Sequence, residues 1–217
     1  MTKVNYNSNI LQEDTMFRAY FTGVFLADGC LHRCIPNKSE KEYYSVILET
    51  SEEDWISRIC SKIGSTYVSR KRIIKSKEYT EYTASWSSNI SKTIKDSMTN
   101  YKDFREYYYS LDLKHKHEFI KGFMDGDGSV CKYNSNSVRI LFYVVDSSVE
   151  EILDDYLKLV NVKYSKHYDK RGHKVIQYSL GVKAAKVLFE SFYGEVYHSR
   201  KYEGLNRVFT RNGFPQQ

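Results

Sequence analysis

The sequence has little proline and no long apolar segment. Only two of its 217 residues are proline, so long strands can form without interruption. No apolar run approaches the ~18 residues that a membrane-spanning helix needs, and the start, MTKVNYNSNI, lacks the apolar core of a signal peptide. We therefore expect a soluble, intracellular protein that is not secreted and has no membrane partner.

Cysteine is also scarce. The four cysteines do not form the CxxC pairs of a structural zinc site, and nothing indicates an oxidising compartment. Cys30, His32 and Cys34 alternate closely, which leaves a metal site open, although small residues on a strand explain the pattern better. We expect all four cysteines to be reduced thiols.

Positive charge and tyrosine are abundant. The chain has 33 Lys and Arg against 27 Asp and Glu, a net charge of +6, which suits a nucleic-acid partner without requiring one. The 20 tyrosines fit half-buried strands. With 41% hydrophobic residues the composition is that of a globular protein, and the length allows two small compact units.

The chain contains an internal repeat. YFTGVFLADGCL at 20–31 matches FIKGFMDGDGSV at 119–130, and the Asp-Gly pairs that begin at Asp28 and Asp127 coincide. The match continues downstream, where SVILETSEEDWISRICSKIGSTYVSRK corresponds to ILFYVVDSSVEEILDDYLKLVNVKYSKH. Such self-similarity indicates two copies of one structural unit. We place them at 1–105 and 106–217.

Each copy predicts the same order of elements. A helix ending at Asp-Gly, at about 14–28 or 115–127, precedes two strands, a helix, two more strands and a closing helix. Ser51 and Ser148 are the expected N-caps of the middle helices. The remaining predicted elements are strands 30–36, 42–49, 66–74 and 78–86 with helices 51–63 and 89–98 in the first copy, and strands 129–134, 137–146, 162–169 and 174–181 with helices 148–160 and 182–193 in the second.

Small residues four positions apart indicate how the two copies join. They share one face of each Asp-Gly helix: Gly23 with Ala27, and Gly122 with Gly126. Two such faces allow close helix packing, which would bring Asp28 and Asp127 together. Converging carboxylates repel unless a cation lies between them. A simple capping role is the alternative, but the helix dipole disfavours aspartate at a C-terminus.

The nine-residue segments FTGVFLADG and IKGFMDGDG resemble the motif of the LAGLIDADG homing endonucleases, and the resemblance covers about residues 15 to 205. It implies an α+β fold with two pseudo-symmetric αββαββα halves. Each half would have a curved antiparallel four-stranded sheet, and the halves would pack through paired motif helices in a monomer. Leu26 replaces the first acid of the motif in the first half, whereas Asp125 keeps it in the second.

The resemblance also implies a function. We expect a site-specific endonuclease that makes a metal-dependent double-strand break in DNA, with short 3′ overhangs, and so promotes mobility of its own intron or gene. Mg²⁺ is the expected metal, with Mn²⁺ as a substitute. Asp28 and Asp127 would hold it together with the backbone carbonyls of Ala27 and Gly126, since Mg²⁺ prefers oxygen donors.

Further catalytic residues follow from the same resemblance. Glu49 and Asp146, at corresponding strand ends, would position water and metal, or would simply precede the next helices. Lys114 and Arg200, with Lys116 and Lys201 as neighbours, would lie near the scissile phosphates, although charge runs of this kind also occur on solvated surfaces.

Strand alternation predicts which side chains face DNA. Parity could slip by one residue, and an ordinary solvent-exposed face is the alternative. The expected DNA-binding residues are Ser69, Lys71, Glu81, Thr83, Ser85, Arg139, Tyr143, Lys163, Ser165, His167, Gln177 and Ser179. Strands of ~8 residues in two halves would cover on the order of 15 to 20 base pairs. Because the outward residues of the halves differ, the target should be asymmetric.

Two other functions remain open on the same fold. One is a DNA-binding regulator that does not cut, and the other is a maturase that binds its own intron RNA and assists splicing. The presence of both Asp28 and Asp127 favours cleavage, because a binding protein has no use for two repelling acids.

Overall fold

The computed structural model describes residues 7–34, 43–87, 89–98, 100–134, 137–168, 175–192 and 198–211. Positions 35, 36, 42, 169, 174 and 193 of the expected elements lie outside these ranges. None of the helices in the described part is long and apolar enough to cross a membrane. Cys30, Cys60 and Cys131 are free thiols.

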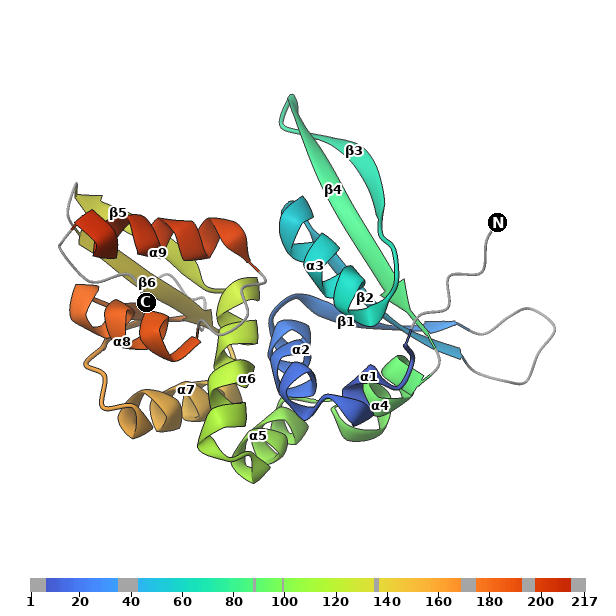
Figure 1. Ribbon diagram of the computed structural model, residues 1–217, viewed down its shortest axis with the longest axis horizontal. Coiled ribbons are helices and arrows are strands. Elements are labelled where there is room, and N and C mark those ends of the chain that lie inside the picture. Colours follow the sequence, from blue (N-terminus) through green and yellow to red (C-terminus); the bar gives the residue numbers. More distant parts are fainter. Residues whose placement is uncertain are drawn as a thin grey trace.

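Two halves follow one another along the chain, as the repeat predicts (Figure 1). The elements of the first are α1 (Ile10–Glu13), α2 (Thr15–Asp28), β1 (Gly29–Cys34), β2 (Tyr43–Thr50), α3 (Glu53–Ile63), β3 (Val68–Ile74), β4 (Lys77–Trp86), α4 (Asn89–Ser97) and α5 (Tyr101–Ser110). Those of the second are α6 (Leu113–Gly126), β5 (Ser129–Asn134), β6 (Ser137–Val144), α7 (Ser147–Leu159), β7 (Ser165–Tyr168), β8 (Ile176–Leu180), α8 (Val182–Phe192) and α9 (Ser199–Arg211). The sequence did not predict α1, α5 or α9, and the expected boundary after residue 105 falls inside α5.

Each half contains a four-stranded antiparallel sheet. The strand orders are β1-β2-β4-β3 and β5-β6-β8-β7, so the same topology occurs twice. Apolar side chains alternate along the central strands: Val46 and Leu48 are buried on β2, and Ile140 and Phe142 on β6. The α+β class and the paired sheets agree with the sequence prediction.

The middle helices begin differently from the prediction. Asp146 caps α7, because its carboxylate accepts a hydrogen bond from the backbone N–H of Ser148 at 2.7 Å. Helix α3 starts after Glu52, and no side chain caps it. Ser51 and Ser148 are therefore not N-caps. An aspartate in extended backbone reaches a first-turn N–H at least as well as a serine, so sequence preference alone does not distinguish them.

The two halves have separate hydrophobic cores. One is built around Trp55 and Trp86 in the first half, and the other around Phe142 and Tyr178 in the second. Leu26, where the first half departs from the motif, packs partly buried against both cores. The place of the missing acid is thus filled by an apolar contact between the halves.

The motif helices α2 and α6 cross with their backbones in contact, side by side at the centre of the molecule (Figure 1). A Cβ added to Gly23 would lie 1.9 Å from the carbonyl oxygen of Phe119, and one added to Gly122 would lie 2.0 Å from that of Tyr20. No other residue type fits at these positions. The crossing sets the C-terminal ends of both helices next to each other.

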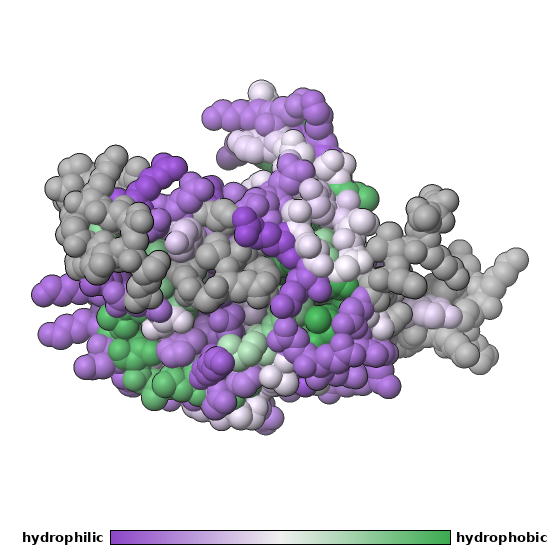
Figure 2. Space-filling view, in the orientation of Figure 1, coloured by the Kyte–Doolittle hydropathy of each residue, from purple (hydrophilic) through white to green (hydrophobic). Residues whose placement is uncertain are grey.

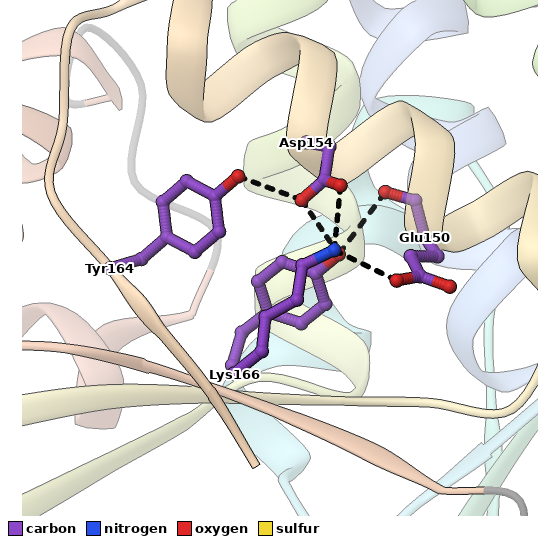
Figure 3. Close-up of polar contacts among 5 residues, drawn as sticks. Glu150, Asp154, Tyr164 and Lys166 are labelled. Carbon is purple, nitrogen blue, oxygen red and sulfur yellow. Dashed lines mark hydrogen bonds and ion pairs between the residues drawn. The ribbon is translucent and has the colours of Figure 1, made fainter. Parts of the chain in front are cut away.

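A partly buried polar cluster joins helix and sheet in the second half (Figure 3). Tyr164 and Tyr178 both donate hydrogen bonds to one carboxylate oxygen of Asp154, at 2.8 and 2.9 Å. Lys166 reaches Asp154 at 2.6 Å and Glu150 at 2.8 Å. Because every charge is paired, the cluster fixes α7 on the sheet.

The first half repeats half of this arrangement. Tyr67 and Tyr82 donate to Glu53 of α3 at 2.9 and 3.0 Å. Ser69 occupies the position that Lys166 has in the second half. Each is the second residue of its strand, and Ser69 pairs with Tyr82 as Lys166 pairs with Tyr178. The tyrosine pair is therefore common to both halves, and the lysine belongs to one.

Candidate active site and DNA-binding interface

Asp28 and Asp127 lie together at the C-terminal ends of the motif helices. Asp28 is the last residue of α2, and Asp127 caps α6. A Cβ on Gly126 would be 3.2 Å from a carboxylate oxygen of Asp28, which shows how near that side chain comes to the other helix. Both carboxylates reach solvent. The structure thus brings the two predicted acids to one open place.

The surroundings of Asp28 and Asp127 disfavour ionisation of both carboxyl groups. Burial by the surrounding chain raises the pKa of Asp28. Burial and then the charge of Asp28 raise the pKa of Asp127 to about 6. In both cases Lys201 acts in the opposite direction. A cation between the carboxylates would remove their repulsion.

Lys201 is a basic side chain whose charge acts on both acids. Its ammonium donates to the carbonyl oxygens of Met124, Asp125 and Gly126 at 2.7, 2.6 and 2.9 Å. The residue is only 7% exposed. Burial lowers its pKa to about 8, while the nearby aspartates raise it. A positive charge at a helix C-terminus also offsets the helix dipole.

The ion pair of Arg200 is with the first half rather than with the acids. Its guanidinium forms an ion pair with Glu52 of the first half at 2.9 Å, and the side chain is 71% exposed. Consecutive helical residues point about 100° apart. In α9 it is Lys201 that turns toward α6. The sequence analysis named Arg200 with Lys201 as its neighbour, and only the orientation of α9 shows which of the two side chains points toward α6.

Lys114 lies far from the acids. It is near the start of α6, whereas Asp127 follows the last residue of that helix. With a rise of ~1.5 Å per residue the two ends are on the order of 20 Å apart. Lys116, its neighbour, pairs with Asp155 at 3.3 Å instead. Helix α6 begins two residues earlier than the predicted 115, so Lys114 belongs to its first turn.

The first acid of the second motif, Asp125, forms part of a bridge between the halves. Tyr20 of α2 donates to its carboxylate at 2.7 Å, and Trp55 of α3 donates to the hydroxyl of Tyr20 at 2.8 Å. Burial raises the pKa of Asp125 to about 6, against the effect of the Tyr20 hydrogen bond and of Lys201. His198 stacks on Trp55 with ring centroids 5.4 Å apart. These contacts fix the end of the interface where Asp28 and Asp127 lie.

Glu49 and Asp146 have different surroundings. Asp146 caps α7, so its position has a structural explanation. Glu49 is exposed and lies 3.6 Å from Arg70 on the neighbouring hairpin. It points to the sheet face opposite the core, because its strand neighbour Leu48 is buried.

In the second half the predicted outward residues lie on the sheet face that points away from the core. Ser165 pairs with Ser179, and His167 pairs with Gln177, which also pairs with Tyr143. Arg139 shares this face, because Val138 and Ile140 on either side are buried. Lys163 is exposed and precedes β7.

In the first half the parity of one strand differs from the prediction. Glu81, Thr83 and Ser85 lie opposite the core face as expected, since Ala84 and Trp86 are buried. Ser69 and Lys71, however, pair with Tyr82 and Thr80 and so lie on the helix side. All of β3 is exposed, so no apolar alternation marks its inner face.

Arg70 and Arg72 occupy the outward positions instead. Both form ion pairs with Glu81, at 2.6 and 2.9 Å. The hairpin β3–β4 that carries them projects beyond the rest of the molecule, on the side where α2 and α6 end (Figure 1). Figure 2 shows mostly hydrophilic side chains over this projection. Its outward face is therefore positioned to reach a large polar partner.

The donor set at the helix ends fits a hard divalent cation. The possible donors are two solvent-reaching carboxylates and the backbone carbonyls of the residues that precede them in the chain, all of them oxygens; the carbonyl of Gly126 also accepts a hydrogen bond from Lys201. Among the described residues no group of three or more His, Cys, Asp or Glu side chains is placed to hold a metal. A bound ion would therefore need water or phosphate oxygens as well, which is the usual condition of Mg²⁺.

Comparison with known proteins gives a consistent fold assignment. Neither a protein-family model nor a curated protein sequence matches the chain. Among solved structures, I-DmoI in complex with DNA and Mn is 17% identical with a TM-score of 0.57, covering 84% of this chain and 98% of that one. The homing endonuclease I-WcaI bound to its DNA recognition sequence is 15% identical with a TM-score of 0.65, covering 93% and 95%.

A third solved structure is similar over most of its length. The LAGLIDADG homing endonuclease I-GzeII in complex with its DNA target is 10% identical with a TM-score of 0.59, and the match covers 90% of this chain and 91% of that one. At sequence identities this low, the structural similarity establishes a shared fold alone. The matches span most of each chain. Both motif segments of this chain lie at the ends of α2 and α6, as the repeat predicts. This chain has the fold of the LAGLIDADG homing endonucleases.

Proposed function

We propose that this protein is a site-specific endodeoxyribonuclease that cuts both strands of a long, asymmetric DNA target with a divalent metal. The observation that carries the proposal is the pairing of Asp28 and Asp127 at a glycine-lined helix crossing between two sheets. The similarity to DNA-bound homing endonucleases supports it. Because one chain supplies both halves, we propose that it acts as a monomer.

Asp28 and Asp127, with the carbonyls of Ala27 and Gly126, are the residues that would hold Mg²⁺ or Mn²⁺. The bound metal would supply an activated water and stabilise the leaving oxygen. The chain contributes the rest. Burial and mutual repulsion of the acids favour binding of a cation, and each carboxylate would serve one strand of the duplex.

Lys201 would act on the phosphate. Its ammonium is a positive charge that acts on both acids, and the phosphoryl group gains negative charge as it is attacked. Glu49, exposed at the end of β2, is the remaining acid that could orient water in the first half. Arg200, whose side chain is 71% exposed, could contact a flanking phosphate while it keeps its pair with Glu52.

The outward faces of the two sheets would read the base edges in the major groove. In the second half these are the predicted Arg139, Tyr143, His167, Gln177 and Ser179 with their neighbours. In the first half we assign the role to Arg70 and Arg72 together with Glu81, Thr83 and Ser85. The different sets predict an asymmetric target. Short 3′ overhangs and mobility of the intron or gene that encodes the chain complete the proposal.

A cleavage selection tests this function. The purified protein is incubated with Mg²⁺ and a randomised duplex library that includes the sequence flanking its own gene. Ca²⁺ replaces Mg²⁺ in a parallel reaction, and an Asp28→Asn/Asp127→Asn variant is the negative control. Asp96→Asn, an exposed acid on α4, is the matched control. We expect one discrete cut site that the double variant loses and Asp96→Asn keeps.

The same experiment distinguishes the alternatives. A discrete site that is bound but never cut with Mg²⁺, Mn²⁺ or Ca²⁺ would contradict the nuclease and establish a DNA-binding regulator. Selective binding of the flanking intron RNA, without any cut in DNA, would instead support a maturase.

A further inference from the structure

Lys201 is a buried cation held by backbone carbonyls. A single ammonium, almost fully buried, donates to three successive backbone carbonyls at the end of α6. One of these is the carbonyl of Gly126, which on the proposed function is a metal ligand. The charges of Asp125, Asp28 and Asp127 also raise the pKa of this ammonium, against the effect of its burial. The end of α6 thus already has a cation of its own.

We propose that Lys201 is the resident counter-ion of this acid cluster, and that in the DNA-free protein it holds divalent metal away from Asp28 and the carbonyl of Gly126. The inference rests on the proposed function, since it concerns the same metal site. An ammonium and a divalent ion repel each other at contact distance. A carbonyl oxygen that accepts a 2.9 Å charge-assisted hydrogen bond is also a poorer metal ligand.

The local structure holds Lys201 in place. Next to it in α9, Arg200 pairs with Glu52, and His198 stacks on Trp55, so the first turn is tied to the first half of the molecule. The Lys201 side chain then crosses back to α6 in the second half. Because the turn is anchored on both sides, the ammonium cannot leave its carbonyls by a simple shift of the helix.

DNA would change this balance. Phosphates arriving at the ends of α2 and α6 add negative charge and oxygen ligands at the same place. The ammonium and a divalent ion can then be accommodated together, because each has anionic oxygens to neutralise. Metal loading would therefore follow DNA binding, and the protein would carry little metal when it is free.

The test removes the charge and measures metal affinity rather than cleavage. Lys201→Gln keeps a donor for the carbonyls, and Lys201→Met keeps the length of the side chain. Binding of Mn²⁺ to the DNA-free protein is followed by the electron paramagnetic resonance signal of the free ion. Loss of a unit charge a few ångström from a divalent ion should tighten binding by about tenfold or more.

Two controls make this result specific. Asp28→Asn added to Lys201→Gln should cancel the gain, because the gained site uses that carboxylate. Lys158→Gln removes an exposed charge from the last turn of α7 and should leave Mn²⁺ affinity unchanged. Circular dichroism establishes that each variant is folded. Unchanged or weaker Mn²⁺ binding in a folded Lys201→Gln protein would overturn the proposal.

The wild-type protein provides an independent arm should both Lys201 variants unfold. Its Mn²⁺ binding is measured with and without DNA under identical conditions. Affinity at least tenfold higher with DNA supports the proposal, whereas saturable micromolar binding without DNA contradicts it. Failure of the nuclease function has a different signature: metal affinity rises in Lys201→Gln, yet the wild type cuts no DNA.

Discussion

Replacing Gly23 with alanine should force the two motif helices apart. The new Cβ would lie 1.9 Å from the carbonyl oxygen of Phe119 and 2.8 Å from the backbone nitrogen of Phe123, so backbone rather than a flexible side chain must move. Restoring an ordinary contact of 3.4 Å requires a shift of roughly 1.5 Å. Overpacking of this kind costs about 3 kcal/mol or more. Alanine recovers about 1 kcal/mol through its better helix propensity, which leaves a net loss of about 2 kcal/mol.

Thermal denaturation followed by circular dichroism measures this loss. For a chain of this length, about 2 kcal/mol corresponds to a fall in Tm of roughly 4–8 °C. Gly204→Ala, in α9, is the matched control, because the added Cβ would meet only a methyl of Val130, at 3.4 Å. The control should melt at the wild-type temperature or slightly above. If Gly23→Ala melts within a degree or two of Gly204→Ala, the helices do not cross as closely as described.

Three other predictions follow from the site and the sheets. Asp127→Asn should raise the Tm of the metal-free protein at pH 7. The pKa of Asp127 is raised to about 6 by burial and by its acidic neighbour, so its ionisation destabilises the fold, and the difference from wild type should vanish as pH falls through 6 toward 4. Tyr20→Phe should cost about 1–3 kcal/mol in urea denaturation, because buried Asp125 loses its hydroxyl donor. Arg72→Gln should reduce the salt dependence of DNA binding by about one unit of slope, whereas Lys71→Gln, on the helix side of the same strand, should change it little.

The fold was largely predictable because it is encoded twice. Two glycine-containing helices with the same Asp-Gly ending are followed by the same alternation of strands and helices, so each copy supports the other. Elements that the repeat did not define were missed. Helices α5 and α9 follow the last predicted helix of each half, and only α9 contributes a side chain to the acids. Their sequences differ too much for one to predict the other.

The site was predictable where it depends on local sequence and not where it depends on distant contacts. The acids end their helices, so their convergence follows from the glycine spacing. Lys201 reaches a carbonyl 75 positions earlier in the chain, and no local pattern distinguishes it from Arg200. The outward residues of β3 were misplaced for a related reason. A strand that is exposed on both faces carries no apolar signal to set its parity.

The close approach of α2 and α6 at Gly23 and Gly122 also bears on how such a protein can evolve. At this crossing the helices meet through main-chain atoms, so side chains that point away from it can change without altering the crossing. Each sheet could then acquire its own set of outward residues, such as the arginines of one hairpin, without loosening the union of the halves. The same property suits the molecule to recombination: a foreign half that retains the glycine should dock onto this one, and a library of new recognition surfaces can be built by exchange of whole halves.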